Sequence, residues 1–301
     1  MKVGITGGTG LIGRSLAKKL CQKGEQVIIF SRKNLLPKDL QNLSSIELIS
    51  NPLPSPEILS NLDAIINLAG ESVIGERWTE KRKLELKTSR VNFTQDLVKN
   101  IIKSHTKPKV FISASAIGYY GMWEDKAPIF EETSPNGQDF LARLCVEWEN
   151  AALEAREVTR VVLARIGIVL STQGGALAQM LPAFKAFVGG PISTGKQYMS
   201  WIHIEDITNA FLFLLDRSDL EGPFNLTAPN PVSNEAFSHI LAKILNRPNL
   251  VKVPSFALSL LYGEGSEVVV KGQNVIPKRL QEAKFSFQFP KLSLALKNLL
   301  S

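Results

Sequence analysis

TGGTGLIG, residues 6–13, is the most informative stretch of this chain. Its glycines at positions 7, 10 and 13 lie between a short apolar run at 3–6 and a segment in which leucines recur at helical spacing. Between a strand and a helix, Gly7 allows a tight turn, Gly10 lets the backbone approach a ligand, and Gly13 lets the helix pack against the strand. Free N–H groups at the start of such a helix bind phosphate. The stretch therefore predicts a dinucleotide-binding turn; the alternative is a glycine-rich turn without a ligand.

Short apolar runs and helical patterns alternate on either side of this turn and beyond it. Further strands are predicted at 27–30, 64–68, 110–113 and 160–170, each after a polar or helical segment. Such alternation predicts right-handed β-α-β units and a parallel sheet. Almost continuous apolar strands fit a sheet that is covered on both faces. We therefore expect an α/β fold, a doubly wound parallel sheet of the Rossmann type over residues 1–170, with a strand near 223–226 returning to it.

The pattern changes after about residue 171, where glycines and prolines interrupt the chain. The run WIHI at 201–204 predicts a strand that leads into a helix at 206–215, and the tail from about residue 229 is mainly helical in pattern. We expect residues 171–301 to form a smaller, mixed lobe that holds the substrate and the C-terminus.

Composition excludes several classes of protein. Hydrophobic residues make up 44% of the 301 residues and charged residues 21%, which is ordinary for a globular protein. The net charge of +7 is spread out, so it favours an anionic small ligand over nucleic acid. No apolar run approaches the ~18 to 20 residues of a membrane span, and MKVGITGG leads straight into a strand, which leaves no room for a signal peptide.

The cysteines and histidines indicate the cellular compartment and whether a metal site is present. Two cysteines, Cys21 and Cys145, form no disulfide framework, so we expect a reducing cytoplasm. Three histidines, at 105, 203 and 239, lie too far apart in the sequence to give a metal-binding spacing, and we expect no metal site.

The end of the second predicted strand indicates which dinucleotide to expect. An NAD site usually has Asp or Glu about 20 residues after the glycines, where it bonds the ribose 2′-OH. Here the strand at 27–30 is followed by Ser31, Arg32 and Lys33, two cations and no carboxylate. A guanidinium donates in a planar fork that suits a 2′-phosphate. We therefore expect NADP; the alternative is that Arg32 and Lys33 are solvated loop charges.

Six motifs spread over nearly the whole chain resemble those of one superfamily. They are TGGTGLIG (6–13), NLAGE (67–71), SASAIGYYG (113–121), LARIGIVLS (163–171), GKQYMSWIHIED (195–206) and IPKRLQEAKFSFQFP (276–290). Together they resemble the extended short-chain dehydrogenase/reductase superfamily, and more closely its NAD-dependent epimerase-like group, whose members are called "epimerase family protein" and have a C-terminal segment of their own.

The resemblance implies roles for particular residues. The turn Ala69-Gly70 would lie along the adenine ribose. Ser115 matches the position of the superfamily's catalytic Ser or Thr. This role fits its chemistry, since a hydroxyl at a strand's C-terminal edge can hydrogen-bond a substrate carbonyl or alcohol. The alternative is a serine that satisfies a backbone group. The residues expected to contact the cofactor are Gly7, Thr9, Gly10, Leu11, Ile12, Gly13, Ser31, Arg32, Lys33, Leu68, Ala69, Gly70 and Ser113.

The sequence departs from the superfamily at the proton donor. That donor is the Tyr of a Tyr-x-x-x-Lys pair, in which Lys lies one helical turn away and lowers the Tyr pKa. The chain has four tyrosines, and none is followed by Lys four positions later. On the predicted helix at 138–155, Phe140 or Leu141 stands near the Tyr position, and Leu144 or Cys145 near the Lys position. Ordinary hydride chemistry is therefore in doubt.

Other residues are candidates for the missing acid. Tyr119 and Tyr120 follow Ser115 closely and are the candidate catalytic substitutes, with a role in the core as the alternative. Glu147 is expected at the surface, while Glu71 is either a site residue or a carboxylate favoured by a helix dipole. We expect Asp206 to cap a helix and His203 to be a packed, hydrogen-bonded histidine.

The sequence is compatible with two main functions. The first is an NADP-dependent oxidoreductase or epimerase-like enzyme with an atypical proton donor, acting on a small polar or nucleotide-linked substrate. The second is a protein of low catalytic power that senses NADP(H) or regulates a partner; an assembly protein that keeps only the fold is a weaker third. The partners expected are a small molecule and a second copy of the chain in a homodimer, with no nucleic acid and no membrane. The identity of the substrate does not follow from the fold.

Overall fold

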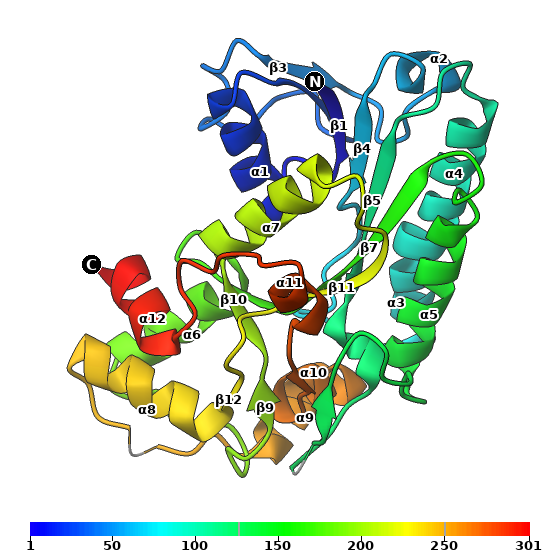
Figure 1. The fold of residues 1–301 in the computed structure, drawn as a ribbon. Helices are drawn as coiled ribbons and strands as arrows, with labels where there is room; N and C mark the ends of the chain where they lie inside the picture. Colours follow the sequence, from blue (N-terminus) through cyan, green and yellow to red (C-terminus); the bar gives the residue numbers. More distant parts are fainter. Residues whose placement is uncertain (126, 250) are drawn as a thin grey trace.

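A computed structural model describes residues 1–125, 127–249 and 251–301. Seven strands form a central sheet in the order β11-β7-β5-β4-β1-β2-β3, and every neighbouring pair is parallel (Figure 1). The strands are β1 (Lys2–Thr6), β2 (Gln26–Phe30), β3 (Ile46–Ile49), β4 (Ala64–Asn67), β5 (Val110–Ala116), β7 (Arg160–Ile166) and β11 (Gly222–Leu226). The sheet confirms the predicted α/β fold of the Rossmann type.

The order of the strands fixes where a ligand can bind. From β1 the chain adds β2 and β3 on one side and then returns to add β4, β5, β7 and β11 on the other. The connections that leave β1 and β4 therefore diverge, and a crevice is left between them at the carboxyl ends of the strands.

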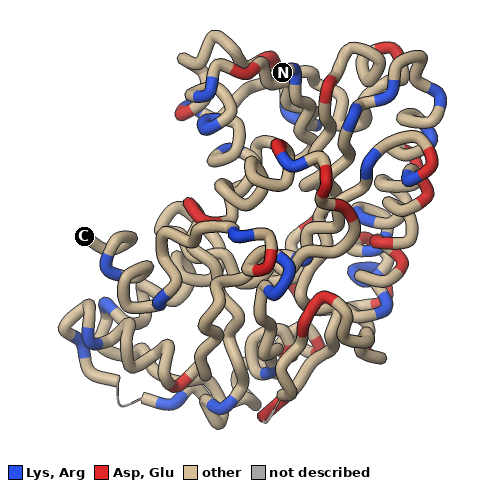
Figure 2. The backbone as a smooth tube through the Cα atoms, viewed as in Figure 1, with Lys and Arg blue, Asp and Glu red and all other residues tan. Residues whose placement is uncertain are grey.

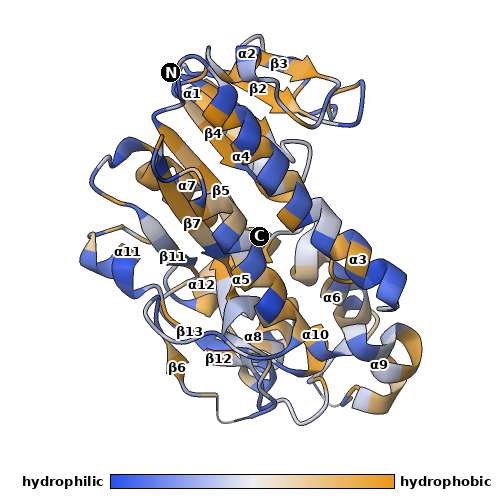
Figure 3. Cartoon of the chain, turned by 90° about the vertical axis from the view of Figure 1, so that its right-hand side faces the viewer, coloured by the Kyte–Doolittle hydropathy of each residue, from blue (hydrophilic) through white to orange (hydrophobic). Residues whose placement is uncertain are grey.

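Helices cover both faces of the sheet, and the alternation of side chains along each strand explains why both faces are apolar. Val3, Ile5 and Ile29 face one layer, formed by α1 (Leu11–Gln22) and α7 (Ile204–Asp216). Ile28 and Ile65 face the other layer, which contains α2 (Pro56–Leu59), α4 (Phe93–Lys103) and α5 (Phe140–Leu153). Figure 3 shows the hydrophobic strands between these layers and the polar outer faces of α4 and α5.

The helix before β5 contains a local irregularity. α3 (Glu80–Lys87), a π-helical turn η1 (Thr88–Asn92) and α4 follow one another without a break. Thr79 caps the first of them, since its side chain accepts a hydrogen bond from the Arg82 N–H at 3.2 Å. π-helical turns widen a helix and frequently occur at functional sites; this one carries Arg90 toward the crevice.

A second group of elements lies beyond the carboxyl edge of the sheet, in the lower part of Figure 1. Small strand pairs form there: β8 (Ile168–Leu170) with β10 (Trp201–His203), β9 (Tyr198–Met199) with β12 (Val232–Ser233), and β6 (Ile129–Phe130) with β13 (Asn274–Val275). The helical segments are η2 (Ile117–Tyr120), α6 (Gly175–Lys185), α8 (Asn234–Leu245), α9 (Ser255–Tyr262), η3 (Gly263–Ser266), α10 (Glu267–Val270), α11 (Lys278–Glu282) and α12 (Leu292–Leu300). Residues of α6, α8 and α12 pack around Trp201 in a separate apolar core.

The structure corrects three details of the sequence prediction. The run at 160–170 is two strands, because the chain leaves the main sheet at Gly167, where a Cβ atom would stand 2.5 Å from the Ser200 carbonyl oxygen. The strand β3 was not predicted. Asp206 does not cap α7: His203 does, and its Nδ1 accepts from the Glu205 N–H at 3.0 Å.

Figure 2 shows basic and acidic residues interspersed over the outer helices in that view. None of the helices in the described ranges is both long and apolar enough to cross a membrane.

Candidate functional site

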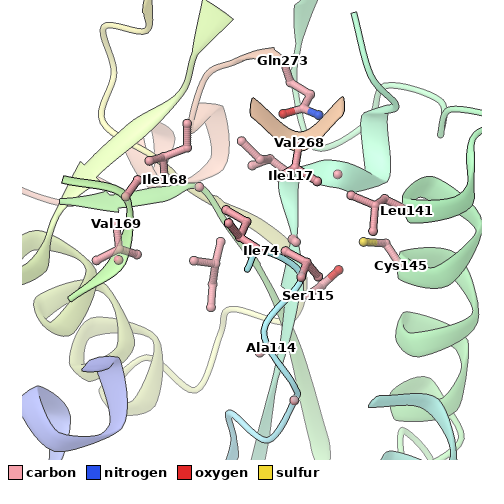
Figure 4. Close-up of a pocket in the computed structure, with 18 of the residues that line it drawn as sticks. Ile74, Ala114, Ser115, Ile117, Leu141, Cys145, Ile168, Val169, Val268 and Gln273 are labelled. Carbon is pink, nitrogen blue, oxygen red and sulfur yellow. The ribbon is translucent and has the colours of Figure 1, made fainter. Parts of the chain in front are cut away.

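A cavity of about 600 Å³ lies at the carboxyl ends of β1, β4, β5 and β7, in the crevice that the strand order predicts. It runs from the Gly7–Gly13 turn, past Ser115, to the elements beyond the sheet. Figure 4 shows Ala114 and Ser115 on the side of the sheet and Gln273 at the opposite end. Ile168 and Val169 form one wall, and Leu141 and Cys145 of α5 form another.

The glycine turn lies at one end of the cavity. Gly10 is the N-cap of α1, and its N–H donates to the Gly7 carbonyl oxygen at 3.0 Å. Gly7 has φ +67°, and a Cβ atom there would stand 2.5 Å from the Leu68 carbonyl oxygen. The N–H groups of the first helical turn have no acceptor within the helix. Of the residues predicted for the cofactor, those that line the cavity are Gly7, Gly10, Leu11, Ile12, Gly13, Leu68, Ala69 and Gly70.

The residues after β2 lie outside the cavity lining. Arg32 is largely exposed, and its Nη2 donates to Glu71 Oε1 at 2.9 Å. Because Glu71 follows Gly70 directly, this ion pair holds the guanidinium next to the end of the cavity formed by β4. Lys33 is exposed, and its N–H donates to the Oγ of the buried Ser31 at 3.0 Å.

Thr9 and Ser113 are likewise absent from the cavity lining in the described part of the chain. Ser113 is fully buried, and its Oγ lies 3.4 Å from the Asn67 Nδ2. Asn67 also accepts from the Thr6 hydroxyl at 2.7 Å and donates to Thr94 Oγ1 at 2.9 Å. This buried network joins β1, β4, β5 and α4 beneath the site, so Ser113 supports the strand ends.

Ser115 lines the cavity, and its hydroxyl belongs to a buried polar network. The strand register aligns Ser115 of β5, Arg165 of β7 and Asn225 of β11 in one row. Glu149 of α5 joins this row: it accepts from the Ser115 hydroxyl at 2.7 Å and pairs with Arg165 through two bonds of 2.8 Å. Ser115, Glu149 and Arg165 are all at least 94% buried. The Ser115 proton is therefore directed to Glu149, which leaves the hydroxyl oxygen able to accept a hydrogen bond.

Tyr119 and Tyr120 take part in this network and do not line the cavity in the described part of the chain. The Arg165 guanidinium lies 3.5 Å from the centre of the Tyr119 ring. The Tyr120 hydroxyl donates to Asn225 Oδ1 at 2.7 Å and accepts from Arg165 Nη1 at 2.9 Å. Burial raises the pKa of Tyr120 to about 12. Their placement gives no support to either tyrosine as the substitute proton donor.

The helix α5 presents an apolar face to the cavity. Asp139 caps it, accepting from the Ala142 N–H at 3.0 Å, and also accepts from the Met122 N–H at 2.8 Å, so the helix start is tied to the segment after β5. Leu141, Leu144 and Cys145 line the cavity. Burial raises the pKa of the Cys145 thiol to about 12, so the thiol stays neutral and cannot replace a lysine ammonium.

Comparison with known proteins identifies the family to which this arrangement belongs. The model of the NAD dependent epimerase/dehydratase family matches residues 3–252, which contain the glycine turn and all of the central sheet except Lys2, the first residue of β1. The chain belongs to this family. A second model, described as a domain of unknown function (DUF1731), matches residues 253–299 and so covers the C-terminal segment.

Relatives of this epimerase/dehydratase chain match it over nearly its full length. The epimerase family protein SDR39U1 homolog, chloroplastic, of Arabidopsis thaliana is 39% identical over 99% of this chain and 86% of its own. The epimerase family protein YfhF of Bacillus subtilis is 37% identical over 100% of this chain and 98% of its own. The crystal structure of human epimerase family protein SDR39U1 (isoform 2) with NADPH has a TM-score of 0.87 and 32% identity, covering 99% of both chains. The predicted resemblance to the extended superfamily and its epimerase family proteins is confirmed.

In this family member the segment 253–299 is held against the junction of β10 and α7 by two buried residues. Asp206 is fully buried and accepts from the Gln288 and Phe289 N–H groups at 2.8 and 2.9 Å. His203 stacks on the Phe289 ring with 3.9 Å between ring centres. Because its Nδ1 accepts from a backbone N–H, its Nε2 carries the proton and donates to Asn298 Oδ1 at 3.1 Å. His203 is thus packed and hydrogen-bonded.

The stability of this epimerase/dehydratase chain should depend on pH through His203. Burial lowers the pKa of His203 to about 4, below its ordinary 6.5. Because the pKa of His203 is lower in the folded state than in the unfolded state, its contribution to stability is complete above the unfolded pKa of 6.5. The contribution is lost as the pH falls from about 6.5 toward about 4, because protonation then favours the unfolded chain. We expect a loss on the order of 1–3 kcal/mol over this range.

The matched variant is His203→Asn, because asparagine caps a helix but does not titrate. Urea unfolding at several pH values should show a steeper fall for the wild type than for the variant between pH 6.5 and 4. Parallel curves for the two proteins would show that His203 does not carry this dependence.

The residues that the sequence prediction missed are Arg90, Glu149, Arg165 and Gln273. Gln197, in the glycine-rich segment 189–201 that the sequence marks as pocket-like, does line the cavity. Glu147, the carboxylate of this helix that the sequence does single out, pairs with Lys87 at the surface, as expected. One signal for Glu149 was present: it lies one helical turn after Cys145, on the face that begins with Leu141.

Proposed function

We propose that this chain is an NADP(H)-dependent oxidoreductase whose reaction takes place beside Ser115. The observation that carries the proposal is that one cavity joins the Gly7–Gly13 turn to Ser115. A dinucleotide held by its phosphates at the turn would extend toward Ser115 along this cavity. When bound, the cofactor supplies or accepts a hydride.

The residues present fit a dinucleotide. The first-turn N–H groups of Leu11, Ile12 and Gly13 are oriented as donors to a phosphate at the start of α1. A Cβ atom at Gly10 would stand 3.2 Å from the Gly7 carbonyl oxygen, in the space beside this turn. NADPH is bound by the related human protein, which supports the same cofactor here.

Arg32 supports NADP over NAD. It is held beside the β4 end of the cavity by Glu71 and could exchange this partner for a 2′-phosphate, which accepts a bidentate, charge-assisted bond. Such a bond is worth roughly 1.5–3 kcal/mol. Arg32→Ala should therefore weaken NADPH binding by about 10- to 100-fold and leave NADH binding nearly unchanged.

Fluorescence titration of both cofactors against the wild type and Arg32→Ala measures this preference. Lys23→Ala is the control, because Lys23 is a cation at the other end of α1, where it pairs with Asp216. If NADH binds the wild type as tightly as NADPH does, or if Arg32→Ala keeps the preference, then Arg32 does not read the 2′-phosphate.

A second candidate function is binding of NADP(H) without turnover, as in a sensor or a regulatory protein. The observation that favours it is the apolar face of α5, where Leu141 and Cys145 offer no proton to the cavity. General acid–base help is worth ~100- to 10,000-fold in rate. If this second function holds, NADPH binds tightly, and no alcohol, ketone or nucleotide sugar oxidises or reduces the cofactor.

An absorbance assay at the nicotinamide band separates the two. Turnover of a substrate from a panel of alcohols, ketones and nucleotide sugars, reduced strongly in Ser115→Ala, supports the oxidoreductase. Brisk turnover that survives Ser115→Ala would place the reaction elsewhere. We further propose a reducing cytoplasm as the location; Cys21 and Cys145 are both free thiols in the structure.

A further inference from the structure

The end of the cavity beyond Ser115 is apolar. Its walls come from Ile117 and Met122 after β5, Leu141 of α5, Ile168 of β8, and Val268 and Val269 at α10. A surface of this kind binds apolar groups, since the favourable free energy comes from removing apolar area from water.

The cavity has few charged residues, and each of them already bonds to other groups of the protein. Arg90 and Lys271 are the charged residues in its lining within the described ranges. Arg90 donates to the carbonyl oxygens of Glu71 at 2.6 Å and of Leu86 at 3.3 Å. Lys271 pairs with Glu267 at 3.0 Å. The diphosphate of a nucleotide-linked substrate needs charge-assisted donors, and at either cation it would have to displace these existing bonds.

Gln197 places an unpaired acceptor in this apolar end. The side chain is 1% exposed. Its Nε2 faces two carbonyl oxygens, of Ile192 at 3.1 Å and of Val269 at 3.4 Å, and this fixes which end of the amide is the nitrogen. The Oε1 atom is buried and has no hydrogen-bond partner among the described residues. A buried acceptor without a partner destabilises a protein unless a ligand or water supplies a donor.

Gln273 and Ser115 present acceptors as well. The Gln273 Nε2 donates to the Gly121 carbonyl oxygen at 2.9 Å and contacts Met122 Sδ at 3.2 Å, so its Oε1 is the free end of the amide. Figure 4 shows this amide at the opposite end of the cavity from Ala114. The Ser115 proton is directed to Glu149, which leaves the oxygen as an acceptor. Gln197 Oε1, Gln273 Oε1 and Ser115 Oγ can therefore each accept a hydrogen bond from a donor on the ligand.

We infer that the substrate is an uncharged, largely apolar alcohol, and that a nucleotide sugar is not the substrate. The inference rests on the proposed function. In the reaction, the alcohol carbon gives a hydride to NADP⁺, the hydroxyl gives up its proton, and the products are a ketone or aldehyde, NADPH and H⁺. Ser115 accepts the hydrogen bond of the reacting hydroxyl, and Gln197 accepts from a second donor where the substrate has one.

The test measures binding to protein saturated with NADPH, where an alcohol cannot be oxidised. Calorimetric titrations use 2-butanol, 2-hexanol and 2-octanol, the ether 2-methoxyoctane, and UDP-glucose. We expect affinity to rise about fourfold for each added methylene. We expect 2-octanol to bind more tightly than UDP-glucose, and about three- to tenfold more tightly than the ether, which cannot donate.

Variants locate the contacts. Ser115→Ala should remove most of the preference for 2-octanol over its ether, whereas Gln281→Leu, at an exposed glutamine of α11, should keep it. Gln273→Leu should change alcohol affinity and leave NADPH affinity unchanged, which separates a site effect from misfolding.

The outcomes separate the two proposals. Tighter binding of UDP-glucose than of 2-octanol, or binding of none of the alcohols by protein that does bind NADPH, overturns the inference and leaves the proposed cofactor in place. Failure to bind NADPH at all overturns the proposed function, and this inference falls with it.

Discussion

Replacing Glu149 with alanine should destabilise the fold by about 3–5 kcal/mol, because it leaves the guanidinium of Arg165 buried without its partner. Arg165 donates two bonds of 2.8 Å to Glu149 and is 3% exposed. The Ser115 hydroxyl also loses its acceptor. Urea unfolding followed by circular dichroism measures the change.

Glu147→Ala is the matched control on the same helix. Glu147 pairs with Lys87 where both side chains are nearly half exposed, and such surface pairs contribute about 0–1 kcal/mol. A double variant, Glu149→Leu with Arg165→Met, removes both charges and should be less destabilised than Glu149→Ala alone. Equal effects of Glu149→Ala and Glu147→Ala would show that the network around Ser115 is not held by this ion pair.

Gly7→Ala should weaken NADPH binding at least about tenfold and destabilise the fold by about 1–3 kcal/mol. The backbone at Gly7 has φ +67°, and the new Cβ atom would meet the Leu68 carbonyl oxygen at 2.5 Å. The turn must shift to relieve this contact, and its shift moves the N–H groups at the start of α1 that we propose bind the phosphates.

Gly24→Ala is the control that separates the loss of NADPH binding expected for Gly7→Ala from the loss of stability. Gly24 has φ +78°, but an added Cβ atom would meet no other described atom within 4 Å. The control therefore has the penalty of the left-handed backbone without the contact, about 1 kcal/mol, and should bind NADPH as the wild type does. If Gly7→Ala binds NADPH as well as Gly24→Ala does, the glycine turn does not form the phosphate site.

Much of the fold follows from local patterns in the sequence. The glycine spacing at 7, 10 and 13 and the apolar runs of β1, β2, β4 and β5 are each visible within ten residues. β3, with the sequence IELI, is not predicted, because a four-residue edge strand with a polar member gives little periodic signal. The break at Gly167 depends on Ser200, which lies far along the chain.

The site is less predictable, because its polar groups meet through tertiary structure. The glycine turn is visible in the sequence, but the partners of Ser115 are not: Glu149 and Arg165 come from a helix and a strand that only the sheet register brings together. Gln273 reaches the cavity from the C-terminal segment, where no short motif marks it. Tyr119 and Tyr120 are close to Ser115 in sequence, but the turn of η2 directs them to Arg165.

A crystal structure of the complex with NADPH would show whether the glycine turn and Ser115 lie at the two ends of one bound cofactor. We expect the diphosphate within about 2.7–3.2 Å of the N–H groups at the start of α1, the 2′-phosphate beside Arg32, and the nicotinamide ring inside the cavity next to Ser115. NADPH bound away from the Gly7–Gly13 turn, or bound there with its nicotinamide outside the cavity, would show that the turn and Ser115 do not form one cofactor site.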